Sequence, residues 1–245
     1  MKKIYIITGT SRGLGEAFVE ELKGQDAQVF CLSRKKYDRN DGFSHVCCDL
    51  SKIETLSGVM DRIFSTINLS QISSITLINN AGVLDPIFPI QRASVEAISN
   101  NIDVNLKALI IFTSLFIQKT KNIDVKKLVV NISSGAGKNP YAGWSVYCAT
   151  KAGVDLFTRC VALEQEVERF PITIFSFYPS IMDTNMQDII RKSEKKDFPR
   201  VEDFIGYKND GNLLSPGLVA QTLLNFIKNN DIESGKVYDV DNMIG

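Results

Sequence analysis

Short apolar runs of strand length alternate with longer amphipathic segments along almost the whole of this 245-residue chain. The central runs are nearly continuous in apolar residues, which is typical of strands buried on both faces of a parallel sheet. Alternation of strand and helix indicates that each helix crosses over from one parallel strand to the next. No Pro-rich or Gly-rich linker divides the chain. We therefore predict one α/β domain over residues 1–245, with a doubly wound parallel sheet of about seven strands and helices on both faces.

The expected elements follow directly from these runs. Strands are expected at Ile4–Thr8, Gln28–Leu32, His45–Cys48, Ser74–Ile78, Lys127–Asn131, Ile172–Phe177 and Lys236–Val240. Helices are expected at Gly13–Lys23, Ile53–Ile67, Ser94–Lys119, Ala142–Arg169 and Pro216–Asn229. Residues 191–212 break the alternation with a charged stretch. We predict a solvated excursion there; a mobile lid is the alternative, because ligands bind at the carboxyl ends of the strands in such sheets.

Charge and composition exclude several classes of function. Lys plus Arg (28) balances Asp plus Glu (28), so bulk charge offers no attraction for nucleic acid or an anionic membrane. The first apolar run, Ile4–Ile7, is too short for a signal peptide or a membrane span. His45 is the single histidine, so we expect no His-based triad and no metal site. The five cysteines lack CxxC spacing, so we expect free thiols in the cytoplasm.

A glycine-rich turn, Thr8-Gly-Thr-Ser-Arg-Gly-Leu-Gly15, directly follows the first expected strand and opens the first expected helix. Glycine lets the backbone turn sharply and approach a pyrophosphate, and the helix N-terminus offers unpaired N–H groups. The spacing is G-x-x-x-G-x-G, which differs from the G-x-G-x-x-G of other dinucleotide folds. We predict a Rossmann-type nucleotide site here, formed by Gly9, Ser11, Arg12, Gly13, Leu14 and Gly15.

The end of the second expected strand indicates which cofactor binds. Enzymes that use NAD usually place an acidic residue there for the ribose 2′-hydroxyl, whereas this chain has Ser33 and Arg34. Arg34 and Arg12 would clamp a 2′-phosphate, with Ser33 as a further donor; an ordinary solvated basic loop is the alternative. We therefore predict NADP(H). The remaining cofactor contacts are expected from Asp49 and Leu50 at the adenine, and from Asn80, Ala81 and Gly82 where the cofactor crosses the sheet.

Tyr147 and Lys151 stand four residues apart in an expected helix, so they share one face and lie about 6 Å apart. A phenol has a pKa of about 10, which an adjacent ammonium lowers by favouring the phenolate. The pair Ser133-Ser134 stands thirteen to fourteen residues upstream of Tyr147. Together with the glycine turn, these residues predict an enzyme.

As a set, these motifs resemble the short-chain dehydrogenase/reductase family, over essentially the whole chain. The matching residues are Thr8–Gly15, Asp49, Asn79–Gly82, Asn105, Ser133-Ser134, Tyr147 and Lys151. The resemblance implies hydride transfer between a nicotinamide ring and a carbonyl or alcohol carbon. In the roles it implies, Tyr147 donates the proton and Ser134 holds the carbonyl oxygen. Lys151 lowers the Tyr147 pKa and binds the nicotinamide ribose, and Asn105 holds a water for proton relay.

We favour Ser134 over Ser133 for the carbonyl oxygen. The family usually places its serine about a dozen residues before the tyrosine, and alternation along a strand end directs one of two neighbours into the cleft.

The chain departs from the family pattern after the sixth strand. The family usually has Pro-Gly at this point, where the glycine lets the backbone run close to the nicotinamide, but this chain has Pro179-Ser180. Ser180 is therefore expected to narrow that corner or to shift the ring. By resemblance, Pro179, the backbone of Ile181 and the hydroxyl of Thr184 are still expected at the carboxamide.

Two stretches, Asn131–Trp144 and Asp183–Gln187, resemble the sepiapterin-reductase-like branch of the family. This resemblance implies NADPH-dependent reduction of one carbonyl of an aromatic 1,2-diketone, as in the conversion of benzil to (S)-benzoin. Tyr141, Trp144 and Met186 are the candidates for an apolar substrate wall, alongside Ser134. For Trp144, ordinary core packing is an equal alternative.

Other functions stay open. A pterin reductase or a general carbonyl reductase is the main alternative, and a catalytically silent NADP-binding sensor is a remote one. The sensor would not need Asn105, Ser134, Tyr147 and Lys151 together. The family is usually dimeric or tetrameric, so the resemblance implies a homodimer or homotetramer that acts on a small carbonyl compound.

Overall fold

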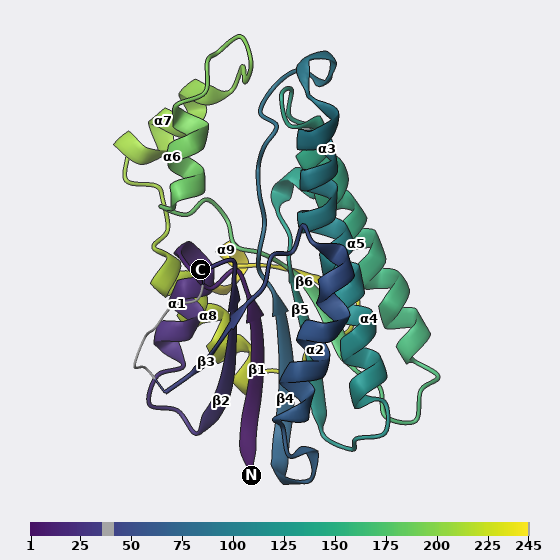
Figure 1. Cartoon of the computed structure of the whole chain (residues 1–245). Helices are drawn as coiled ribbons and strands as arrows, with labels where there is room; N and C mark the ends of the chain where they lie inside the picture. Colours follow the sequence, from purple (N-terminus) through teal and green to yellow (C-terminus); the bar gives the residue numbers. More distant parts are fainter. Residues whose placement is uncertain (36–41, 245) are drawn as a thin grey trace.

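The computed structural model, which describes residues 1–35 and 42–244, forms a seven-stranded parallel sheet with helices on both faces (Figure 1). The strands are β1 (Lys2–Thr8), β2 (Ala27–Ser33), β3 (Ser44–Cys47), β4 (Ile72–Asn79), β5 (Lys126–Ile132), β6 (Thr173–Tyr178) and β7 (Val237–Asp239). Their order across the sheet is β3-β2-β1-β4-β5-β6-β7. The predicted doubly wound parallel sheet is confirmed.

The strand order reverses at β1. The chain runs from β1 to β2 and β3 in one direction and then returns to place β4 on the other side of β1. The loops that leave β1 and β4 therefore diverge to opposite faces and open a crevice at the carboxyl ends of these two strands. This edge of the sheet is where a ligand site is expected.

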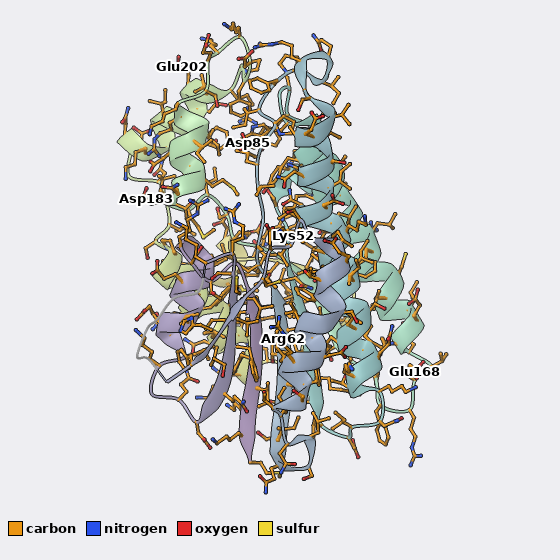
Figure 2. All side chains as sticks on the ribbon, viewed as in Figure 1. Lys52, Arg62, Asp85, Glu168, Asp183 and Glu202 are labelled. Carbon is orange, nitrogen blue, oxygen red and sulfur yellow. The ribbon has the colours of Figure 1, made fainter. Side chains whose placement is uncertain are left out.

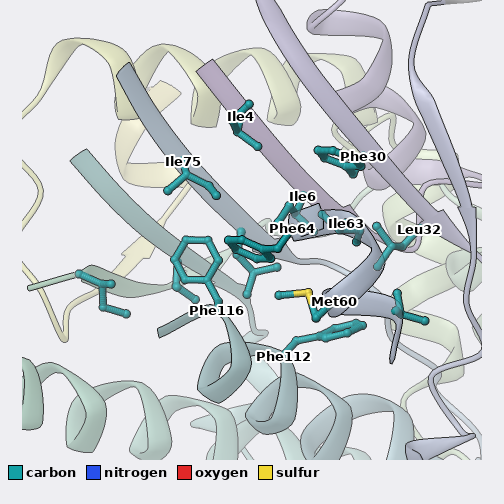
Figure 3. Packing of buried hydrophobic residues seen from close by; sticks show 14 of the residues in the cluster. Ile4, Ile6, Phe30, Leu32, Met60, Ile63, Phe64, Ile75, Phe112 and Phe116 are labelled. Atoms are coloured by element: carbon teal, nitrogen blue, oxygen red, sulfur yellow. The ribbon is translucent and has the colours of Figure 1, made fainter. Parts of the chain in front are cut away.

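Helices cover both faces of the sheet. They are α1 (Gly13–Glu21), α2 (Leu56–Ser65), α3 (Val95–Ile102), α4 (Ala108–Thr120), α5 (Ser145–Gln165), α6 (Asn185–Arg191), α7 (Val201–Asn209), α8 (Pro216–Asn229) and α9 (Asp241–Ile244). One face packs on α1 and α8, with Phe18 and Leu223 fully buried. The other face packs on α2, α4 and α5, and Figure 3 shows Phe64, Phe112 and Phe116 in this second core.

The helix expected at Ser94–Lys119 spans Val95–Thr120, but a π-helical turn at Asp103–Lys107 separates α3 from α4. Such turns contain one extra residue and are frequent at functional sites. By length and composition alone, these 26 residues could cross a membrane. However, Phe112 and Phe116 of α4 are buried against the sheet. This is the position of a core helix.

The helix α5 is shorter than the predicted Ala142–Arg169. It begins at Ser145, because Gly143 has a left-handed backbone with φ of 88° and Trp144 caps the helix. A side chain at position 143 would also stand 2.3 Å from the Asp197 carbonyl oxygen. The approach of the chain near Asp197 therefore fixes where α5 starts.

The prediction of a solvated excursion at residues 191–212 is wrong. This segment contains α7, and its Phe198, Val201 and Phe204 are buried in a third core with Trp144 and Tyr147. In Figure 1, α6 and α7 form one arm above the strand ends, opposite α3. The charged residues dominate the sequence of this segment and suggest exposure. The few large apolar side chains between them are the ones that pack into the core.

The arm formed by α6 and α7 is connected to the loop between β4 and α3. Arg92, which follows β4, forms an ion pair with Asp197, which precedes α7. The Arg92 guanidinium also lies 5.2 Å from the centre of the Phe88 ring. Asp85, labelled in Figure 2, lies on the loop between β4 and α3. This ion pair and the third core, which also contains Leu84 and Ile87, join the loop after β4 to the segment around α7.

Candidate active site

A cavity of about 330 Å³ lies at the carboxyl ends of the strands, where the strand order reverses. Most of the residues predicted for the cofactor line it: Gly9, Ser11, Arg12, Gly13, Leu14, Ser33, Arg34, Asp49, Leu50, Asn80, Ala81, Gly82, Pro179 and Thr184. Tyr147, Lys151 and Met186 line it as well. The fold therefore brings the predicted nucleotide residues and the Tyr–Lys pair to one cavity.

The glycine turn is packed tightly against the end of β4. Gly9 has φ of 73°, and a side chain there would lie 2.8 Å from the Ala81 Cα. A side chain on Gly15 would lie 2.2 Å from the Gly9 carbonyl oxygen. The Thr8 hydroxyl accepts hydrogen bonds from the Asn80 and Ala81 amides, each 3.0 Å long. Glycine is required at positions 9 and 15 because the backbone passes too close for any side chain.

The first turn of α1 fits a phosphate group. Its cap residue, Arg12, is extended and makes no side-chain capping hydrogen bond. Backbone N–H groups at a helix N-terminus, together with the helix dipole, bind anions when no side chain satisfies them. Arg12, Gly13 and Leu14 all face the cavity. These residues would hold the pyrophosphate of a dinucleotide.

The end of β2 carries the residues predicted to choose the cofactor. Arg34 is exposed at the cavity wall, as is Arg12 on the opposite side of the turn. The hydroxyl of Ser33 donates a 2.6 Å hydrogen bond to the Lys35 carbonyl oxygen, so this donor is already engaged. Partial burial raises the pKa of Asp49, but hydrogen bonds from Ser51 and the charge of Arg34 outweigh it and leave this pKa lowered. Asp49 is thus a carboxylate at neutral pH.

Tyr147 and Lys151 lie on the inner face of α5, as their spacing predicts. Both are buried, and the Lys151 ammonium lies 5.7 Å from the centre of the Tyr147 ring. The same ammonium donates a 2.7 Å hydrogen bond to the Ile132 carbonyl oxygen at the end of β5. This bond fixes the lysine between the strand end and the tyrosine.

Burial controls the ionisation of both groups. It raises the pKa of Tyr147 to about 12, against a hydrogen bond with Ser134 that lowers it. It lowers the pKa of Lys151 to about 8, against the charge of Asp155, which raises it. The net shift at Tyr147 is opposite to the predicted one, because desolvation of the phenolate outweighs the interactions that stabilise it. At pH 7 Tyr147 is a neutral donor and Lys151 a cation.

Of the two serines, Ser134 is the one that meets Tyr147. Its side chain is the one that lowers the pKa of the Tyr147 phenol, and its hydroxyl accepts a 3.2 Å hydrogen bond from the Ala136 amide. Ser133 is buried, and its hydroxyl donates to the Lys151 carbonyl oxygen over 3.4 Å. Ser133 contributes to the cavity wall, but its hydroxyl is directed to the helix backbone. The geometry agrees with the choice of Ser134.

Asn105 stands in the π-helical turn and is buried. Its amide oxygen accepts from the Val83 N–H at 2.8 Å, and its amide nitrogen donates to the Val83 carbonyl at 2.7 Å. The same nitrogen donates to Asn101 over 2.8 Å. In this position Asn105 fixes the loop that follows β4 beside Gly82 and Lys151. Asn101, which the sequence analysis does not name, could have been found from its position one turn before Asn105.

Ser180 adopts the backbone of the glycine that it replaces. Its φ is 56°, in the left-handed region that few residues other than glycine adopt. Its hydroxyl donates a 2.9 Å hydrogen bond to the carboxylate of Asp241 in α9. The expected narrowing of this corner does not occur through the side chain, which reaches an exposed carboxylate. Pro179 and Thr184 line the cavity together with Met182, whereas Ile181 is not among its lining residues.

The predicted substrate wall is only partly assembled. Met186 lines the cavity, and Leu84 and Ile189, which the sequence analysis missed, lie there with it. Trp144 is instead a core residue that stacks on Phe198 with ring centres 4.5 Å apart. Its ring meets the edge of Tyr147 at 5.8 Å. Tyr141 packs beside Trp144 under the Arg200 guanidinium. Trp144 therefore packs against Tyr147, and Tyr141 packs against Trp144.

A family model described as short chain dehydrogenase matches residues 3–195, so the chain belongs to the short-chain dehydrogenase/reductase family. It is therefore an oxidoreductase of a family that binds a nicotinamide cofactor, and the glycine turn and the first turn of α1 fit such a group. Within the residues that the structure describes, no cluster of His, Cys, Asp or Glu could hold a metal ion.

Particular relatives lie close along the whole chain. A benzil reductase that forms (S)-benzoin, from Bacillus cereus, is 43% identical over 96% of this chain and 98% of that protein. Sepiapterin reductase of Rattus norvegicus is 27% identical over 96% of this chain and 95% of that protein. The crystal structure of the KRED1-Pglu enzyme matches with a TM-score of 0.82 and 26% identity, covering 96% of this chain and 100% of that one. The resemblance predicted from the motifs is confirmed.

Replacing Ser180 by Gly and by Ala separates the backbone strain from the hydrogen bond. Both variants lose the bond to Asp241, but only Ala keeps the cost of a left-handed backbone, which is about 1 kcal/mol. We expect Ser180→Ala to have a free energy of unfolding about 1 kcal/mol below that of Ser180→Gly, measured by urea titration. Equal stability of the two variants would show that position 180 is not left-handed.

Proposed function

We propose that this protein is an NADPH-dependent carbonyl reductase that reduces one carbonyl of an aromatic 1,2-diketone, with benzil as the test substrate and (S)-benzoin as the product. One observation carries the proposal: Ser134, Tyr147 and Lys151 converge beside the nucleotide cavity, against an apolar wall. The high identity to benzil reductases over the full chain supports the choice of substrate. The loaded cofactor would supply the hydride.

The chain's own residues would handle the carbonyl oxygen. The Ser134 hydroxyl would hold this oxygen and stabilise the charge that grows on it. Tyr147 would then deliver its proton to form the alcohol, as a positioned general acid. Because burial keeps the Tyr147 pKa at about 12, the donor is fully protonated in the physiological range. Lys151, held by the Ile132 carbonyl, would supply positive charge beside the phenol and bind the nicotinamide ribose.

The apolar part of the cavity supports a ring-bearing substrate. Leu84 from the loop after β4, and Met186 and Ile189 from α6, line it on the side of the arms. Methionine and aliphatic side chains pack well against aromatic rings.

Sepiapterin has a dicarbonyl-like side chain, so a pterin reductase is the second candidate, supported by similarity to sepiapterin reductases. Relative turnover of benzil and sepiapterin separates the two candidates. A silent sensor is disfavoured, because Asn105, Ser134, Tyr147 and Lys151 converge beside one cavity.

The choice of NADPH over NADH rests on charge. Arg12 and Arg34 both line the cavity, and the end of β2 has no acidic residue for a ribose 2′-hydroxyl. A guanidinium forms strong charge-assisted hydrogen bonds with a phosphate. A phosphate needs hydrogen-bond donors, and the Ser33 hydroxyl already donates its proton to the Lys35 carbonyl oxygen. We therefore assign the 2′-phosphate to the two arginines.

We also propose that the protein acts in the cytoplasm as a homodimer or homotetramer. Its five cysteines are free thiols, which supports a reducing compartment. The outer face of α5 carries exposed small and apolar residues at helical spacing, namely Ala149, Ala152, Leu156 and Leu163. Leu156 and Leu163 are 55% and 65% exposed. A stripe of this kind supports self-association through α5.

The first test compares initial rates of benzil reduction for wild type and Tyr147→Phe, each with NADPH and NADH. We expect NADPH-dependent formation of (S)-benzoin, and a loss of at least about 100-fold in kcat for Tyr147→Phe, the usual contribution of a general acid. Chiral chromatography identifies the product. Absence of benzil turnover with intact NADPH binding would reject the diketone assignment.

Arg34→Ala tests the cofactor assignment. We expect the KM for NADPH to rise by about 10-fold or more, because a charge-assisted hydrogen bond contributes about 1.5–3 kcal/mol. Rates with NADH should change little. Lys35→Ala is the matched control, since it removes an equal charge from a neighbour that does not line the cavity. An equal effect of both variants would mean that the preference for NADPH comes from the total positive charge of this loop and not from a specific contact of Arg34.

The pH profile of reduction follows from the two buried groups. Tyr147 stays protonated up to about pH 12, but Lys151 loses its charge as the pH rises through about 8. We therefore expect kcat/KM for reduction to be flat from about pH 6 to 7.5 and to fall above about pH 8. Lys151→Arg cannot lose its proton in this range, so whatever activity remains should lack this fall. A profile that stays level up to pH 10 would contradict the proposed role of Lys151.

Light scattering coupled to gel filtration tests the oligomer. We expect wild type to elute as a dimer or tetramer, and the double variant Leu156→Glu/Leu163→Glu to elute as a smaller species. Both replaced side chains are exposed in the isolated chain, so the variant should keep its fold by circular dichroism. A monomeric wild type would reject this proposal and leave the assignment of the reaction unaffected.

A further inference from the structure

A buried carboxylate, Asp155, lies on α5 behind the catalytic residues. It is 7% exposed, and one of its oxygens accepts a 2.6 Å hydrogen bond from the Tyr178 hydroxyl at the end of β6. The other oxygen is buried and has no hydrogen-bond partner among the residues that the structure describes. Neither hydride transfer nor protonation of the substrate uses this group.

The position of Asp155 relates it directly to Lys151. Tyr147, Lys151 and Asp155 follow one another at intervals of four residues along α5, so they share one face, with neighbours about 6 Å apart. The turn Gly135–Gly137, which follows Ser134, packs against this face. A side chain on Gly137 would stand 2.8 Å from the Asp155 carboxylate and 3.0 Å from the Lys151 carbonyl oxygen. The turn therefore separates the carboxylate from solvent.

A buried charge is costly unless an opposite charge and hydrogen bonds compensate it. Tyr178 provides one hydrogen bond. Arg159, one turn further along α5, donates to the Asp155 backbone carbonyl over 3.4 Å, and Asp239 of β7 lies near Tyr178. Of the cations on this helix face, Lys151 is the buried one. The buried ammonium and the buried carboxylate thus lie one helical turn apart on the same face, where each charge favours the other.

We propose that Asp155, held in place by Tyr178, is a positioning residue that keeps the Lys151 ammonium charged, while the Ile132 carbonyl holds this ammonium beside Tyr147. This inference rests on the proposed function, in which the charge of Lys151 serves reduction. Its consequence is that the working pH range of the enzyme is set one helical turn away from the reacting atoms, by a residue that touches neither substrate nor cofactor.

The ionisation of Lys151 is consistent with this arrangement. Burial lowers the pKa of Lys151 to about 8, and the Asp155 charge is the opposing influence. A nearby opposite charge commonly changes the pKa of a cation by about one unit or more. Without Asp155, the pKa of Lys151 would therefore fall further below its usual value, and a larger share of Lys151 would be uncharged at neutral pH.

Asp155→Asn tests the proposal with two readouts, because it keeps the size of the side chain and removes its charge. The first is the pH titration of the Lys151 side chain by NMR, with the signal assigned by its loss in Lys151→Arg. The second is the pH profile of reduction. We expect both midpoints to fall by about one pH unit, while the rate at pH 6 stays within about twofold of wild type.

Two further variants serve as controls. Tyr178→Phe removes the hydrogen bond and keeps the charge, so its Lys151 midpoint should stay closer to that of wild type than the midpoint of Asp155→Asn. Asp197→Asn neutralises a carboxylate that is equally buried but pairs with Arg92, and it should leave the Lys151 titration unchanged.

An unchanged Lys151 titration in Asp155→Asn, with a rate lowered by the same factor at every pH, would overturn the proposal and leave Asp155 a packing residue. Equal midpoints for Asp155→Asn and Tyr178→Phe would also overturn it, because packing and not charge would then be responsible. The NMR titration does not need turnover. If benzil is not a substrate, it still decides the role of Asp155, so failure of the proposed function is distinguished from failure of this inference.

Discussion

The contact between the ends of β1 and β4 determines the geometry of the rest of the site. Thr8 receives two amide hydrogen bonds from the start of the loop after β4, and the Asn80 amide donates to the Thr8 carbonyl at 2.9 Å. These bonds bring Gly9 against Ala81. The strand order reverses at this point, so the crevice that parallel sheets offer to ligands opens here. The first turn of α1 and the loop after β4 are both oriented by this junction.

Burial of charge is the second constraint. The catalytic helix places a phenol, an ammonium and a carboxylate in succession on its inner face, and all three are buried. Desolvation alone would leave both the phenol and the lysine neutral. Backbone carbonyls, the Ser134 hydroxyl and neighbouring charges decide how far each group departs from that state. In the role proposed for Asp155, the charges are coupled along α5, and Tyr178 of β6 takes part in this coupling through its hydrogen bond to Asp155.

Much of this structure could be predicted from the sequence, for identifiable physical reasons. The central strands β1, β4 and β5 are largely buried and nearly continuous in apolar residues, so the pattern reveals them, whereas the short edge strands β3 and β7 are partly exposed and give a weaker signal. Short local motifs also reveal the site residues. Gly9 and Gly15 stand where the backbone leaves no room for a side chain, and Tyr147 and Lys151 are recognised by a spacing that puts them on one face of a helix. The segment of α6 and α7 could not be predicted in the same way. Phe198, Val201 and Phe204 are scattered among charges, and their burial depends on Trp144, which is distant in sequence. Whether Trp144 faces a substrate or a core is likewise a tertiary question that residue type does not answer.

The pairing of Ser180 with Asp241 has an evolutionary consequence. A residue with a side chain occupies a backbone conformation suited to glycine, and a carboxylate from the C-terminal helix gives that side chain a partner. The two positions are therefore expected to vary together. Replacement of Asp241 would leave the Ser180 hydroxyl without this partner, whereas a glycine at position 180 would need none. The pair couples α9 to the loop after β6, so a substitution in α9 is expected to be felt at Pro179, which lines the cavity.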